Sequence, residues 1–149
     1  MNPIERSRIK MTLNSITFAF AIAPVIYFFI ALKMPIIQHH PEHFEIIKNM
    51  FLGIAIISVI AGLMIMNLKP EKFRKFAEAS NPPSHPAQHQ MLLAMTLHES
   101  IAVFGFVYYF MSGTREFLNA AVPVSIVLIL VDRLKTKIEQ APPSRGINE

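Results

Sequence analysis

Four long apolar segments constrain the fold of this chain more than any other feature. They cover about residues 11–32, 50–68, 91–112 and 117–131, and Glu99 is the only charged residue inside them. About 20 helical residues, rising ~1.5 Å each, cross the ~30 Å hydrocarbon core of a bilayer. Only 16% of the chain is charged, against about 25% in soluble domains. The sequence therefore predicts an all-α integral membrane protein with four transmembrane helices, arranged as two hairpins.

The fourth apolar segment is short for a membrane span. Charged residues flank it, namely Arg115 and Glu116 on one side and Asp132 and Arg133 on the other. Such side chains can snorkel toward the headgroups, so a helix over about 115–134 fits the bilayer. We expect one transmembrane domain over residues 1–140, followed by a disordered tail over 141–149.

Basic residues are divided unequally between the two sides of the predicted spans. Only Lys33, Lys48 and Arg115 of the 14 lysines and arginines fall in the first and third loops. The others precede the first span or follow the second and fourth. Positive residues concentrate on the cytoplasmic side, so we expect both termini and the middle loop there. The expected location is a plasma membrane of bacterial inner-membrane type.

Two further segments have a readable pattern. The basic N-terminus and the apolar run after it would also suit a cleavable signal peptide, but the run continues to full spanning length, which favours a retained span. In the middle loop, Phe73, Phe76 and Ala77 are spaced at i, i+3 and i+4 after Pro70. This spacing predicts a short interfacial helix with its rings toward lipid.

Several function classes lack the residues they need. The chain has no cysteine, which excludes disulfides, thiolate metal sites and cysteine nucleophiles. The basic residues form no stripe with interleaved aromatics, so no nucleic-acid partner is expected. No hydrolase, phosphate-loop or zinc-protease motif occurs. The loop histidines His39, His40 and His43 are interpreted as solvated rather than metal-binding, and we expect no metal or organic cofactor.

Glu99 is the residue most able to carry chemistry. It lies eight residues after Met91, hence about 12 Å into the membrane. An ionised carboxylate there costs at least ~2.5 kcal/mol unless it is protonated, paired or open to water or an ion. Intramembrane acids are therefore candidates for binding H⁺ or Na⁺. A structural interhelical hydrogen bond is the alternative.

Polar and small residues around Glu99 complete the predicted site. Thr96, His98 and Ser100 are candidate ion-binding neighbours, although His98 and Glu99 point about 100° apart on a helix. His98 is interpreted as a packed, hydrogen-bonded residue rather than a haem or metal ligand. Ala94, Ile101 and Gly105 form a face suited to close packing on a neighbouring helix. Because the spans offer few polar partners for Glu99, we expect an oligomer or a subunit of a membrane complex.

The segment from Met95 to Val107, MTLHESIAVFGFV, resembles the second helix of the proteolipid, or c, subunit of rotary F-type and V-type ATP synthases. In that family a carboxylate is followed six residues later by glycine, as Glu99 is here by Gly105. An Asn81-Pro82 turn also precedes the carboxylate at a similar distance. The resemblance covers the second and third spans, from about Gly53 to Ser112, where Gly53 and Gly62 stand in place of the family's glycine-rich packing run.

What the resemblance implies is a carboxyl that takes up and releases a cation, most simply a proton, within a membrane complex. Glu99 would be that carboxyl. The alternative function is a noncatalytic accessory or assembly subunit that docks on partner helices, with Glu99 in a structural role. Neither function gives this chain a catalytic activity of its own.

Overall fold

The fold is a bundle of four long helices with one short helical segment at one end. The computed structural model describes residues 3–34, 44–80 and 85–139. Its elements are α1 (Pro3–Lys33), α2 (Glu45–Met66), the 3₁₀ turn η2 (Pro70–Phe73), α3 (Arg74–Ala79), α4 (Pro86–Ser112) and α5 (Glu116–Glu139). The four long helices are long and apolar enough to cross a membrane. The prediction of an all-α protein with four such helices is confirmed.

The helices extend past the predicted spans at several ends. For example, α1 begins at Pro3 and includes Arg8 and Lys10. Hydropathy marks only the part of a helix that lies in hydrocarbon, whereas the backbone hydrogen bonds continue through polar flanking residues. The predicted tail over 141–149 lies outside the described residues.

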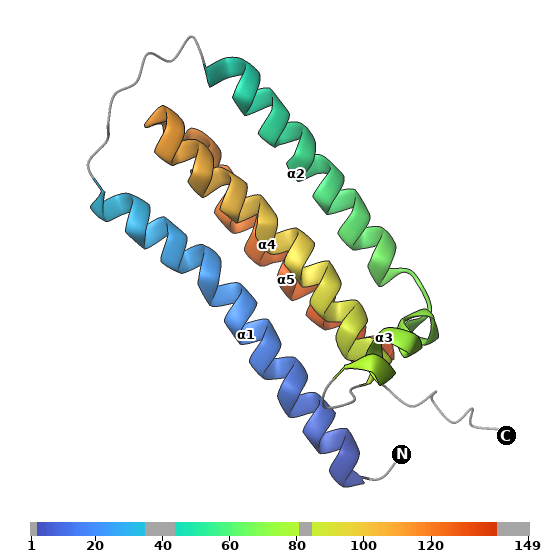
Figure 1. Cartoon of the computed structure of the whole chain (residues 1–149). Coiled ribbons are helices and arrows are strands. Elements are labelled where there is room, and N and C mark those ends of the chain that lie inside the picture. The colour runs from blue at the N-terminus through green and yellow to red at the C-terminus, as the bar shows by residue number, and fades with distance from the viewer. Residues whose placement is uncertain (1–2, 35–43, 81–84, 140–149) are drawn as a thin grey trace, which may run out of the picture.

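α4 is the central helix of the bundle. It packs against α5, α2 and α1, and α1 also packs against α5. Figure 1 shows α4 and α5 in the middle, with α1 on one side and α2 on the other. Among the described residues α1 and α2 make no contact with each other. Residues on α4 can therefore reach all three of the other long helices.

Polar caps fix both ends of α4. At its start Ala87 N donates to His85 Nδ1 (3.2 Å), and His85 N donates to Gln88 Oε1 (2.9 Å), which makes a capping box ahead of Pro86. At its end Gly113 adopts the left-handed conformation (φ 72°) that a glycine reaches without strain. These caps set the boundaries of the helix that carries the predicted site.

The side chain of Gln90 ties α4 to the end of α2. It is buried, and its Nε2 donates to the carbonyl oxygens of Ile65 (2.9 Å) and Leu68 (2.8 Å). The carbonyls at the end of a helix lack part of their hydrogen bonding within the helix; Ile65 O accepts from Leu68 N (3.1 Å), and the Gln90 amide adds a side-chain donor to the carbonyls of both residues.

A short helix is present where the sequence predicts one after Pro70. Some of its apolar side chains are buried against the bundle, and others are exposed. η2 and α3 lie at the end of the bundle where α1 begins and α5 ends (Figure 1). Phe73 and Ala77 are buried and Phe76 is exposed. The expectation that both rings face lipid is wrong for Phe73, because η2 and α3 pack on α4 through that side of the segment.

Candidate functional site

Glu99 stands midway along α4 and is half-buried beside α1. Tyr27 on α1 donates its hydroxyl hydrogen to Glu99 Oε1 (3.1 Å), and the Tyr27 ring stacks on Phe106 of α4 with centroids 5.4 Å apart. The ring stacking holds the hydroxyl against the carboxyl group. No ion pair to Glu99 occurs among the described residues. This carboxyl therefore has a neutral donor as its partner rather than a cation.

The other predicted ion ligands turn away from Glu99. Thr96 is exposed and donates to the Leu92 carbonyl of its own helix (2.9 Å). Ser100 donates to the Leu97 carbonyl (2.6 Å) and lies 3.3 Å from the Ser58 hydroxyl on α2. The structure thus brings Glu99 together with α1 and Ser100 together with α2, and it does not gather a set of ligands around one ion.

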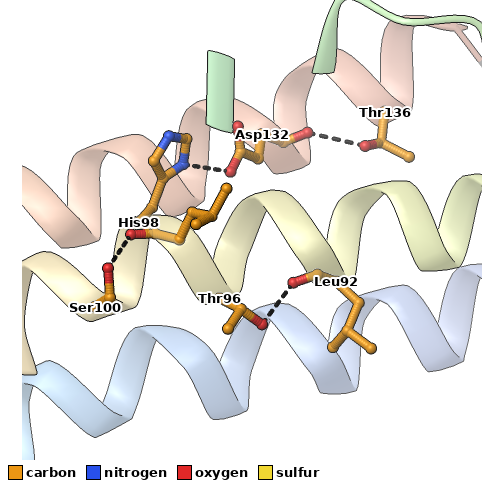
Figure 2. Close-up of polar contacts among 7 residues, drawn as sticks. Leu92, Thr96, His98, Ser100, Asp132 and Thr136 are labelled. Atoms are coloured by element: carbon orange, nitrogen blue, oxygen red, sulfur yellow. Dashed lines mark hydrogen bonds and ion pairs between the residues drawn. The ribbon is translucent and has the colours of Figure 1, made fainter. Parts of the chain in front are cut away.

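His98 makes a buried pair with Asp132 of α5. His98 Nδ1 lies 2.7 Å from Asp132 Oδ2, and both side chains are 0% exposed. Figure 2 shows the imidazole reaching from α4 to the carboxyl group on α5, while Thr96 points away from it. The two groups are hydrogen-bonded to each other at this distance, so each has a polar partner within the bundle.

Gly62 of α2 closes the remaining side of the His98 ring. A Cβ atom added to Gly62 would overlap His98 Nε2 and would lie 2.8 Å from the two neighbouring ring carbons. Only a glycine leaves room for the ring here. His98 Nε2 and Asp132 Oδ1 have no hydrogen-bond partner within the described residues. The buried pair His98–Asp132 therefore joins three helices but has no contact with the exterior.

Two residues at the end of the fourth span were expected to extend toward the lipid headgroups, but both are buried in the bundle. Asp132 pairs with His98, and Arg133 donates from Nε to Asn14 Oδ1 on α1 (3.2 Å). The expectation of snorkelling is wrong at this end because α1 and α4 cover the last turns of α5 and supply polar partners there. Sequence reasoning missed Asp132, Tyr27 and Arg133 as site residues.

The small-residue face of α4 packs inside the chain. Ala94 and Ile101 are buried, and a Cβ atom added to Gly105 would lie 2.7 Å from Ala121 Cβ on α5. Gly53, in contrast, has open space where a Cβ would stand. The predicted close-packing face therefore joins α4 to α5 and α2, whereas Gly53 leaves room for a larger residue.

No group of three or more metal-ligating side chains occurs in the part of the chain that the structure describes. His85 caps α4, and His39, His40 and His43 lie outside the described residues. Comparison with protein-family models, curated proteins and solved structures found no match. The resemblance to the proteolipid subunit stays a prediction from the residues of the second and third spans.

Proposed function

We propose that this protein binds a proton within the membrane, at the carboxyl group of Glu99. One observation carries the proposal: Glu99 lies at mid-helix, is half-buried, and has a tyrosine rather than a cation as its partner. An ionised carboxylate without a cation is costly in hydrocarbon, whereas the protonated form is neutral. In the function that we propose, the Glu99 carboxyl group takes up a proton and releases it when a polar path opens.

The other intramembrane acid suits this role less well. Asp132 is fully buried and is already hydrogen-bonded to His98. A group that exchanges protons with its surroundings needs a route to water, a mobile partner or a neighbouring subunit. Glu99 has partial exposure and Asp132 has none, so we assign proton exchange to Glu99 and helix association to the buried pair His98–Asp132.

A hydrophobic carbodiimide tests this proposal, because it reacts with protonated carboxyl groups that lipid can reach. We expect one adduct per chain, located at Glu99 by peptide mass spectrometry, and no adduct in Glu99→Gln. Tyr27→Phe should raise the labelling rate, because it removes the hydroxyl that contacts Glu99 Oε1 and leaves this oxygen open to the reagent. Asp132 should stay unlabelled in the folded wild type and so serves as the internal control.

A wild-type protein without labelling from about pH 5 to pH 9 would contradict proton exchange at Glu99. It would favour the second candidate function, an accessory subunit that docks on partner helices. The observation behind that candidate is the outer face of α2, where Ile46, Ile57 and Met64 are exposed apolar residues. Assembly into a membrane complex belongs to both proposals, because a proton bound inside a bilayer does work only when a partner receives it.

The orientation we propose places the start of α1, the α3 segment and the end of α5 in the cytoplasm, with two antiparallel hairpins. It rests on the excess of lysine and arginine at that end. A single cysteine at Glu71 should resist an impermeant maleimide added to intact cells, and one at Glu116 should react. The chain has no native cysteine to interfere. Reaction at Glu71 without permeabilisation would reverse the orientation.

A further inference from the structure

An apolar cavity lies between the η2–α3 segment and α4, and neither Glu99 nor the buried pair His98–Asp132 is among its lining residues. Its volume is about 280 Å³, and it is lined by Phe73, Phe76, His89, Leu92, Leu93 and Thr96. The hydroxyl of Thr96 already donates to the Leu92 carbonyl, so it offers the cavity no free hydrogen. Aromatic rings and leucine side chains make most of the wall. Such a wall suits a hydrocarbon chain rather than a polar solute.

The cavity lies near one end of the bundle, where membrane-spanning helices reach the headgroups of a bilayer. η2 and α3 lie at the end of the bundle (Figure 1), and Phe73 of η2 and Ala77 of α3 are buried where the two elements pack on α4. Phe76 lines the cavity and is 68% exposed, and the lining residues Leu92 and Leu93 are exposed as well. A short helix held at this level, with one ring exposed, has the arrangement of an interfacial helix.

The η2–α3 segment lines one side of the cavity and, with Lys69 before it, has four basic residues against two acidic ones, Glu71 and Glu78. The η2–α3 segment contains Lys72, Arg74 and Lys75, with Lys69 just before it. Arg74 pairs with Glu78 at 3.5 Å on the exposed side. Lys72 and Lys75 are exposed and make no ion pair among the described residues. Lys72 stands one turn before Phe76 and Lys75 is its neighbour, so two lysines lie on the segment that carries the apolar ring.

We propose that this cavity binds an anionic phospholipid. One acyl chain would lie against Phe76, Leu92 and Leu93, and the phosphate would lie near Lys72 and Lys75. The observation that selects this occupant is that one short segment both lines the apolar cavity and carries an excess of positive charge, which complements a lipid with an acyl chain and an anionic headgroup. The attraction between one lysine and an anionic membrane surface is about 1 kcal/mol, which corresponds to about a fivefold preference for the anionic lipid. A zwitterionic lipid would fill the cavity without this gain.

The absence of tryptophan from the chain makes a direct test possible. Phe76→Trp places the only indole in the lining of the cavity, and Phe18→Trp places one on α1, where the parent residue is 69% exposed. Each variant is reconstituted with phosphatidylglycerol or phosphatidylcholine brominated on the acyl chains, and quenching is measured against the brominated fraction. For the Phe76→Trp indole, we expect brominated phosphatidylglycerol to reach half-maximal quenching at a fraction about five times lower than brominated phosphatidylcholine does. The Phe18→Trp indole should give equal curves for the two lipids.

Charge variants separate a specific site from general solvation by lipid. Lys72→Gln with Lys75→Gln, added to Phe76→Trp, should make the two quenching curves coincide. Lys33→Gln with Lys48→Gln, at the other end of the bundle, should leave the anionic preference unchanged. Equal curves at the Phe76→Trp indole in the parent protein would overturn the proposal. The proposal would also be overturned if neither brominated lipid quenched the Phe76→Trp indole, because another occupant would then fill the cavity. Carbodiimide labelling of Glu99 is a separate measurement that neither result affects.

Discussion

Asp132→Leu should lower the free energy of unfolding by about 3 kcal/mol. Removing one partner of a buried ion pair costs about 3–5 kcal/mol in soluble proteins, because the other partner stays buried without compensation. We expect the lower end of this range, since an unfolded chain in a bilayer also finds polar partners. The loss would be read from the midpoint of SDS-induced unfolding in mixed micelles.

The double variant His98→Leu with Asp132→Leu provides the matched comparison. It removes both polar groups, and apolar replacements of a buried pair are often neutral or stabilising. We therefore expect the double variant to recover most of the stability that Asp132→Leu loses. If Asp132→Leu changed the stability by less than about 0.5 kcal/mol, the 2.7 Å contact between His98 and Asp132 would not be a feature of the folded protein.

Gly62→Ala should also destabilise the protein, by about 1–3 kcal/mol, although alanine is the better helix former. The added methyl group would overlap a His98 ring that Asp132 holds in place, and overpacking a close contact has a cost of this size. Gly53→Ala is the matched control on the same helix. With nothing within 4 Å of the new Cβ, it should be neutral or stabilise by up to about 1 kcal/mol.

A double-mutant cycle locates the cause of the Gly62 effect. In a His98→Ala background the ring is absent, so the cost of Gly62→Ala should largely disappear. An equal cost in both backgrounds would mean that another neighbour, and not the His98 ring, limits the space at Gly62. The cycle thus measures how firmly the buried pair His98–Asp132 holds α2 against α4.

The spans were predictable from sequence because the length of an apolar run is a local property. The contacts between helices were not, since a span's hydropathy does not say which face meets which neighbour. Asp132 illustrates the difference. It adjoins Arg133 at the edge of an apolar run, and this position favoured an interpretation as a snorkelling end. The covering helices α1 and α4 could not be seen from that run alone.

A usable signal for the buried pair was nevertheless present. His98 lies 14 residues before Ser112, and Asp132 lies 16 residues after Glu116, so antiparallel helices place them about 21 Å and 24 Å from the same end. A base and an acid at one depth in neighbouring spans are candidates for pairing. Tyr27 offered a weaker signal, because an aromatic hydroxyl in a span has no preferred partner until the packing of α1 on α4 is known.

The central position of α4 has a consequence for how the protein is made. α1 and α2 have no contact with each other among the described residues, and both depend on α4 for their packing. During synthesis α2 is complete at Met66, but α4 is complete only at Ser112, roughly 2–10 s later at ordinary elongation rates. For that interval the first two helices have lipid or an insertion factor as their neighbours. A ribosome that stalls before Pro86 would therefore release a chain with two unassembled helices, a form that membrane quality-control proteases can recognise.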